Sequence, residues 1–326
     1  MFTGEESGFN VSEFMWAKEA SWDLVWISFP AVAGGGNGLC VSQNLVDAYR
    51  MQNGMDINEP GSGYPDPSEA WKPIGGNGKT FSNYQLSSQV AKMYDNREMR
   101  FYASIVFNYC YREASSYTGT AANNKNFYQT FYKDSPFGAW SDYPNDKSFS
   151  GYNCIKYCHP SDKPGNGGTV RSKYFPLIRY AEVLLNYVEA MNEMEGSYTD
   201  NEHNVTVSRD PAEMVKYFNM IRYRAGLPGI TLADAANKTK MRELIKRERQ
   251  VEFALEGRRF YDLRRWGELQ RTMADPFIVM NVDARSNESQ KFYTRTVSSY
   301  QYSLFNITNK QCLYPIMQRR IDKNPN

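Results

Sequence analysis

Two stretches in the second half of the chain decide its fold class, YFPLIRYAEVLLNYVEAMNEM (174–194) and RELIKRERQVEFALEGRRFYDLRRWGEL (242–269). In the first, apolar residues recur at the spacing of one helix face, namely at Ile178, Ala181, Leu184, Leu185, Val188 and Met191. The composition changes at Lys173, so we expect a helix from there, with Pro176 in its first turn and its end marked by Gly196.

Between these stretches, PAEMVKYFNMIRYRAG (211–226) predicts a second amphipathic helix, capped by Asp210 and stopped at Gly226. Two such helices joined by a polar turn make an αα-hairpin. A third helix is expected over residues 241–257, with a break at Gly257 and a continuation over 258–269. The pairing is similar to tetratricopeptide stacking, although no sequence period repeats.

The first half of the chain is rich in turn-forming residues and predicts long loops. Residues 99–113 and 151–160 are expected as short strands because they are rich in aromatic and β-branched residues. Residues 21–32 indicate an extended or buried segment, and Ser42 is a candidate N-cap of a short helix. The glycine run at 34–38 lacks the G-K-[ST] ending of a phosphate-binding loop and indicates a flexible loop.

Composition excludes several classes of protein. The chain has 326 residues, of which 41% are hydrophobic, enough for a sizeable core. Its 38 basic and 36 acidic residues give a net charge of +2, which argues against nucleic acid as a partner. No apolar run is long enough for a membrane span. The 5 cysteines are an odd number for a disulfide framework and are expected to be mostly free and buried.

Motifs for catalysis or metal binding are weak. Cys154, Cys158 and His159 match no usual zinc spacing, and no G-x-S-x-G motif is present. We therefore expect no metal, no cofactor and no catalytic residue. The charge-rich residues 246–266 have two interpretations. They form an anion site through Arg249, Glu252, Glu256, Arg259, Asp262 and Arg265, or these residues make ion pairs along and between packed helices.

Aromatic residues make up 15% of the chain, and many lie in polar loops. A flat ring can cover the apolar face of a sugar, and the alternative is that such rings pin irregular loops onto the core. The loop over residues 117–149 and the separate segment SEAWKPIGG supply our candidate ligand-binding residues, which are Trp140, Tyr143, Phe137, Tyr132 and Trp71.

Several segments, in the same order along the chain, resemble the SusD/RagB family. They are NLVDAYRMQNGMDI, REMRFYASIVFN, GYNCIKYCHPS, the two stretches quoted at the outset, and the ending LYPIMQRRIDKNPN. The resemblance implies a mainly α fold with tetratricopeptide-like helical hairpins, a large loop-rich portion and a few short strands. It also implies a single domain over residues 1–326, incomplete at its N-terminus. Within it, 1–170 form the loop-rich, ligand-facing part, 171–275 the helical part and 276–326 the C-terminal tail.

The resemblance further implies a function. The protein would bind glycans at the outer-membrane surface and pass them to a TonB-dependent transporter resembling SusC. Its own contact with the membrane would be a lipid anchor absent from this chain. Two alternatives stay open beside this non-enzymatic role, a peptide-binding RagB-like protein or helical scaffold, and a glycoside hydrolase whose paired carboxylates come from distant positions.

Overall fold

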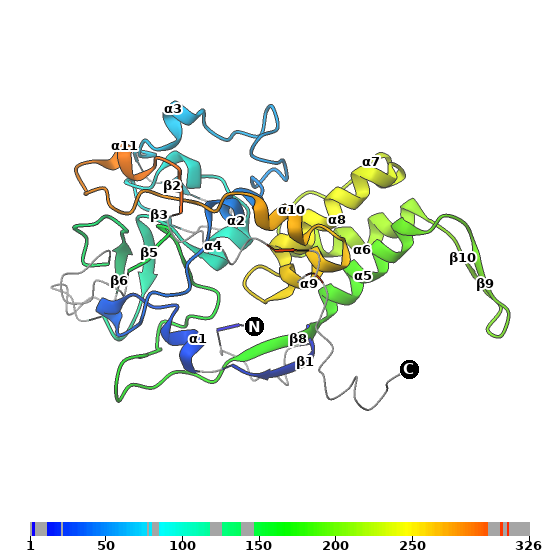
Figure 1. The fold of residues 1–326 in the computed structure, drawn as a ribbon, viewed down its shortest axis with the longest axis horizontal. Coiled ribbons are helices and arrows are strands. Elements are labelled where there is room, and N and C mark those ends of the chain that lie inside the picture. Colours follow the sequence, from blue (N-terminus) through cyan, green and yellow to red (C-terminus); the bar gives the residue numbers. More distant parts are fainter. Residues whose placement is uncertain are drawn as a thin grey trace.

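The protein is mainly helical, with a compact group of helices on one side and a loop-rich part on the other (Figure 1). The computed structural model describes residues 2–3, 12–20, 22–76, 78–79, 85–117, 126–137, 147–298, 307–308 and 312. Every sheet formed within these ranges has two strands. The predicted fold class is confirmed. None of the helices in the described ranges has the length and apolar character required to cross a membrane.

The helical part is built around α5, which packs against both α6 and α8. Its elements are α5 (Tyr180–Glu193), α6 (Pro211–Arg224), α7 (Leu232–Ala236), α8 (Lys238–Glu252), α9 (Arg258–Arg265) and α10 (Leu269–Ala274). Side chains from α5, α6 and α8 interdigitate in one apolar core, represented by Leu185, Val188, Phe218 and Ile245. The predicted helical hairpins are therefore present, and burial of these apolar faces stabilises them.

A local capping signal sets the start of α6 as predicted. The Asp210 carboxylate accepts hydrogen bonds from the backbone N–H groups of Ala212 at 2.8 Å and Glu213 at 3.2 Å. The predicted break before α9 is present, and Gly257, with φ 75°, directly precedes this helix. The break is longer than expected, because α8 already ends at Glu252 and residues 253–257 form turns. The expected continuation over 258–269 is shorter, since α9 ends at Arg265.

The expected helix start at Lys173 is wrong. Residues Tyr174–Arg179 form strand β8, which pairs antiparallel with β1 (Phe14–Glu19), and α5 begins only at Tyr180. Pro176 lies in β8 opposite Ala17, where a two-stranded sheet can accept a residue without an N–H. Glu13 caps α5 from the neighbouring chain segment, since its backbone oxygen accepts from the Tyr180 N–H at 2.9 Å.

The polar turn expected between the first two helices is a β-hairpin. Strands β9 (Tyr198–Asp200) and β10 (Val205–Val207) pair antiparallel and project from the helical part into solvent (Figure 1). The helix α5 ends at Glu193, three positions before the predicted stop at Gly196. Gly196 instead lies in the exposed link to this hairpin.

Short elements around an aromatic core make up the loop-rich part. Its helices are α1 (Trp22–Trp26), η2 (Ala31–Ala33), α2 (Gln43–Ala48), α3 (Pro67–Ala70), η3 (Lys92–Tyr94), α4 (Met99–Ser104) and α11 (Ser289–Phe292). Its strand pairs are β2 (Gly78–Lys79) with β3 (Gln85–Leu86), β4 (Ile105–Val106) with β7 (Asn153–Cys154), β5 (Cys110–Glu113) with β6 (Asn126–Gln129), and β11 (Ile278–Val279) with β12 (Thr296–Val297). The predicted Ser42 cap is confirmed, because its hydroxyl accepts from the Leu45 N–H at 3.3 Å.

Three predictions in this part need correction. Residues 99–113 begin as helix α4, with strand only at β4 and β5, and residues 151–160 contain strand only at β7. Residues 21–32 contain helix α1 and are therefore not an extended segment, although the expected burial is confirmed at Val25 and Phe29. In α4 the rings of Phe101 and Tyr102 are buried, so packing against the core outweighs the strand preference of aromatic residues.

The glycine run forms an irregular loop, but the structure shows a packing reason for the glycines. Gly35 and Gly36 are buried. A Cβ on Gly35 would lie 2.2 Å from the Phe29 backbone oxygen, and one on Gly36 would lie 2.5 Å from the Trp26 ring. Glycine is thus required here because two chain segments approach closely.

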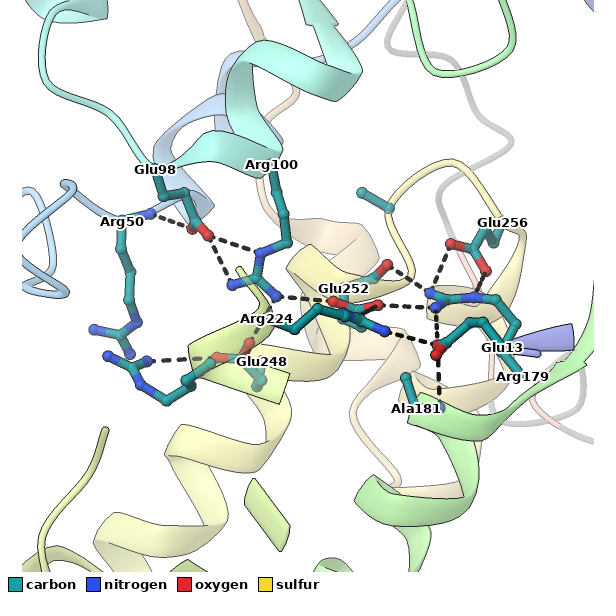
Figure 2. A network of polar contacts seen from close by, with 12 residues as sticks. Glu13, Arg50, Glu98, Arg100, Arg179, Ala181, Arg224, Glu248, Glu252 and Glu256 are labelled. Atoms are coloured by element: carbon teal, nitrogen blue, oxygen red, sulfur yellow. Dashed lines mark hydrogen bonds and ion pairs between the residues drawn. The ribbon is translucent and has the colours of Figure 1, made fainter. Parts of the chain in front are cut away.

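An ionic network holds the helical part against the loop-rich part (Figure 2). We define it by Glu13, Glu98, Arg100, Arg179, Arg224, Glu248, Glu252 and Glu256. Arg179 pairs with Glu252 at 2.9 Å and with Glu256 at 2.8 Å. Arg100 in α4 reaches Glu248 at 2.7 Å and Glu252 at 3.0 Å in α8. Ion pairing is therefore the main role of the charge-rich stretch, with most partners supplied by distant elements.

Candidate ligand-binding site

Trp71 lines a cavity of about 680 Å³ in the loop-rich part. It follows the short helix α3, and its half-buried ring packs against the main aromatic core. This cavity is larger than the one between α5 and α9, at about 480 Å³, and the one between α8 and α10, at about 450 Å³. It falls in the range of sites that bind small ligands.

The walls of this Trp71 cavity come from segments far apart in the sequence. Tyr64 and α3 form one wall, Asp47 of α2 lies at another, and the chain after α11 contributes Tyr293 and Arg295. Further polar side chains, Asn58, Asp66, Ser68, Gln290 and Thr294, also line it. An aromatic face and several hydrogen-bonding groups therefore meet in one cavity.

Arg295 is the charged centre of the Trp71 cavity. It forms a bidentate ion pair with Asp47, with Nη1 to Oδ2 at 2.8 Å and Nη2 to Oδ1 at 3.1 Å, and it donates to the Tyr64 hydroxyl at 3.3 Å. Burial opposes the charged form of Arg295, but Asp47 outweighs burial and raises the pKa of the guanidinium. Burial raises the pKa of Tyr64, which keeps its hydroxyl neutral.

A series of buried hydrogen bonds from Gln43, Tyr152 and Tyr94 holds the Asp47 carboxylate in place. Its Oδ1 accepts from the Gln43 amide at 2.7 Å, and Gln43 Oε1 accepts from the Tyr152 hydroxyl at 2.5 Å. The Tyr152 and Tyr94 hydroxyls lie 2.7 Å apart. Arg295 and Asp47 are thus presented by a rigid framework, which reduces the entropy lost when a ligand binds.

Tyr132, a predicted ligand-binding residue, is buried, with 1% of its surface exposed. Its hydroxyl lies 2.7 Å from Ser289 Oγ, and its ring contacts Phe292 edge-on at 4.9 Å. Both partners belong to α11, the helix just before Arg295. In this arrangement Tyr132 supports the cavity wall and has no free ring face for a ligand.

Phe137 is also buried, with 7% of its surface exposed. It stacks on Phe127 at 4.9 Å and on Tyr117 at 5.8 Å in a separate small core. The Phe137 ring therefore anchors its irregular loop to the core, as the alternative interpretation of the aromatic residues predicts. Trp140 and Tyr143 lie outside the described residues.

Of the residues that line this cavity, the sequence analysis named Trp71 but not Tyr64, Asp47 or Arg295. Asp47 lies within the segment NLVDAY, which resembles the family but does not by itself indicate a binding residue. Arg295 had no local signal, because its importance arises from a partner far away in the sequence.

The Cys154, Cys158 and His159 group does not form a metal site in the structure. Burial raises the pKa of Cys154 to about 12 and that of Cys158 to about 11. Within the described ranges, no cluster of three or more histidine, cysteine, aspartate or glutamate side chains is suited to hold a metal ion. All five cysteines are free, as expected, and Cys110, Cys154 and Cys158 are buried.

Comparison with known proteins identifies the family. A model of the SusD family matches residues 19–326, which include the Trp71 cavity and the whole helical part. The chain belongs to the SusD family.

Individual SusD-family relatives agree in sequence and in fold. The curated SusD-like protein P2 of Formosa agariphila is 30% identical over 135 residues, covering 40% of this chain and 24% of that protein. The solved structure of BT4246 is 23% identical, covers 99% of this chain and 51% of its own, and superimposes with a TM-score of 0.74.

A third SusD-family relative is a SusD-like carbohydrate-binding protein of Bacteroides fragilis. It is 18% identical, with a TM-score of 0.61, and covers 100% of this chain and 56% of its own. The present chain thus spans about half the length of these solved structures.

Proposed function

We propose that this chain is part of a non-catalytic protein that binds oligosaccharides or polysaccharides at the cell surface. Membership of the SusD family supports the proposal, as does the similarity of fold to a Bacteroides fragilis protein named for carbohydrate binding. The observation that carries it at the level of residues is the Trp71 cavity, which joins an aromatic face to a rigid pair of charged groups.

The chemistry of the Trp71 cavity suits a sugar. A sugar ring has an apolar face that Trp71 covers, and hydroxyl groups that both donate and accept hydrogen bonds. Arg295 has five N–H donors, and its bonds to Asp47 and Tyr64 leave donors for a ligand. Asp47 and Asp66 provide acceptors. Neutral sugars bind in such sites through stacking and many hydrogen bonds.

We extend the proposal to delivery. The glycan would pass to a TonB-dependent outer-membrane transporter resembling SusC, with the full-length protein held at the outer membrane by a lipid anchor. The support is the ordered set of segments that resemble the SusD/RagB family. Co-purification of the full-length protein with such a transporter from its native membrane checks this step, and its absence under mild detergent would contradict it.

The glycan proposal is tested by Trp71→Ala. After a glycan array identifies a ligand, calorimetry should show about five- to thirtyfold weaker binding, because loss of an aromatic contact removes roughly 1–2 kcal/mol. Trp71→Phe should retain part of the affinity. Trp140→Ala, in the loop outside the described residues, is expected to weaken binding without unfolding the protein.

Trp16→Ala is the matched control, since Trp16 lies on β1 and is 63% exposed. It should leave affinity unchanged, and thermal denaturation should show every variant folded. Unchanged affinity in the folded Trp71→Ala protein would exclude this cavity. An array without hits, together with co-purified peptide, would favour the peptide-binding alternative, and detectable turnover of a polysaccharide would favour a hydrolase.

A further inference from the structure

A basic pocket of about 450 Å³ lies between α8 and α10, apart from the Trp71 cavity. Six cationic side chains line it, Arg50, Lys240, Lys246, Arg247, Arg259 and Arg271, against four acidic ones, Asp56, Glu243, Glu268 and Asp275. The chain segment around Asp56 separates the two cavities, because Asp56 lines this pocket and Ile57 and Asn58 line the other. The lining therefore carries a surplus of positive charge.

Several of these cations already have carboxylate partners. Lys246 Nζ lies 2.7 Å from Glu268 and 3.2 Å from Glu243. Arg247 pairs with Asp56, and Lys240 pairs with Asp234 at 2.7 Å. Glu268 is shared, because Arg271 also approaches it at 3.5 Å. The acids of the pocket are thus largely engaged by these partners.

Arg259 differs from its neighbours in the charge-rich stretch. Among the described residues it has no ion pair and no side-chain hydrogen bond, and its Nη1 is buried without a partner. The nearby Asp262 is occupied, since it accepts from Arg249 and from Arg265 Nε, each at 2.9 Å. The Trp266 ring lies 5.8 Å from Arg259 Cζ. Asp262 and Glu268 attract the Arg259 guanidinium electrostatically, but within the described ranges neither lies close enough to form an ion pair with it.

Arg50 is a second guanidinium in this pocket without an ion pair among the described residues. It is 8% exposed, and among the described residues its guanidinium donates to the Gly54 carbonyl oxygen alone, at 3.3 Å. A guanidinium that is removed from water without an ion-pair partner is costly, and its planar set of donors matches an oxyanion well. Arg50, which is buried, and Arg259, which is partly buried, therefore point to a ligand that supplies negative charge.

We propose that this pocket binds an oxyanion, a carboxylate or sulfate group carried by a small acidic ligand, with Arg259 as its principal contact. The pocket volume falls in the range of small-ligand sites. The partly buried setting strengthens the attraction between guanidinium and oxyanion over that in bulk water. The site is separate from the Trp71 cavity and does not depend on the proposed glycan function.

The test is a calorimetric titration of the full chain with sodium glucuronate and, separately, with sodium sulfate, at constant ionic strength. Glucose serves as the uncharged probe. We expect saturable binding of at least one anion and none of glucose. Binding of glucuronate alone would identify a sugar-borne carboxylate, and binding of sulfate would identify tetrahedral oxyanions as ligands.

Arg259→Gln should weaken anion binding at least tenfold, and Arg259→Lys should retain part of it. Arg242→Gln is the matched control, because Arg242 lies on α8 outside this pocket and pairs with Glu193, and it should change affinity less than twofold. Arg259→Gln should also leave the melting temperature unchanged or higher, since it removes a partly buried charge that has no ion-pair partner among the described residues. Absence of saturable binding to either anion, or equal binding by wild type and Arg259→Gln, would overturn the proposal.

The test of anion binding in this pocket can be distinguished from the test of glycan binding in the Trp71 cavity. Trp71→Ala should leave anion binding unchanged, and Arg259→Gln should leave binding of a neutral glycan unchanged. If Trp71→Ala abolished anion binding while Arg259→Gln did not, the anion would occupy the Trp71 cavity and the present proposal would fail.

Discussion

Glu252, buried at the end of α8, receives ion pairs from three arginines on three different elements. Arg179 ends β8, Arg100 lies in α4 and Arg224 lies in α6 (Figure 2). Burial alone would raise the pKa of Glu252, but the three arginines outweigh it and lower this pKa to about 2. A single carboxylate thus couples the helical part to both β8 and α4.

This coupling predicts a pH-dependent effect of Glu252→Gln. The folded pKa lies below the ordinary value of about 4.3, so the carboxylate stabilises the fold fully above that value. The stabilisation is lost as the pH falls toward 2. At pH 7 we expect the free energy of unfolding to drop by about 3 kcal/mol, because the buried Arg179, the partly buried Arg100 and the exposed Arg224 all lose a carboxylate partner.

Urea denaturation at several pH values between 7 and 3 measures this difference. Glu243→Gln is the control, because Glu243 is 68% exposed and its pair with Lys246 should contribute less than about 1 kcal/mol. A loss that is equal in the two variants, or a Glu252→Gln loss that does not shrink toward low pH, would contradict this account.

At the scale of elements, the β9–β10 hairpin differs from the rest of the helical part. Tyr198, Val205 and Val207 are exposed on it, and an isolated two-stranded hairpin is only marginally stable in water. The hairpin therefore contributes little to the apolar core that holds α5 against α6 and α8.

Replacement of residues 197–208 by a short Gly-Ser linker should change the free energy of unfolding by less than about 0.5 kcal/mol. Deletion of α7 is the matched comparison and should be clearly destabilising. Ala235 in α7 is fully buried, and a capping box formed by Thr231 and Asp234 starts the helix. Thermal denaturation of both variants measures the contrast, and a large loss on hairpin replacement would show that the hairpin packs in the folded state.

At the scale of the whole molecule, the helical and loop-rich parts share their stabilising contacts. Val251 and Ala254, at the end of α8 and just after it, belong to the aromatic core of the loop-rich part. Glu248 and Glu252 of the same helix pair with Arg100. We therefore predict that the loop-rich part and the helical part, which the sequence analysis divided at residues 170 and 275, unfold together as one cooperative unit.

An isolated fragment of residues 171–275 should accordingly fail to fold cooperatively. It would expose Val251 and Ala254 and leave the buried acids of α8 without Arg100. Circular dichroism during heating should show a broad, weak transition for the fragment and one sharp transition for the full chain. A sharp transition of the fragment at the temperature of the full chain would show two independent domains.

Features that depend on neighbouring residues could be predicted from the sequence alone. The Asp210 cap, the Ser42 cap and the Gly257 break were predictable because each signal acts within one turn of a helix. The amphipathic patterns gave α6 and α8, and the order of segments along the chain indicated the family that the comparisons confirm.

Features that depend on contacts between residues far apart in the sequence could not be predicted and are visible only in the folded structure. Tyr174–Arg179 became strand β8 because β1 pairs with it. Trp71 lines a cavity together with Asp47 and Arg295, which lie far from it in the sequence. Tyr132 is buried because α11 packs against its ring. Arg249 and Arg259 look equivalent in the sequence. In the fold Arg249 forms an ion pair with Asp262, whereas Arg259 forms no ion pair with any described residue, because electrostatic pairing depends on distance in space.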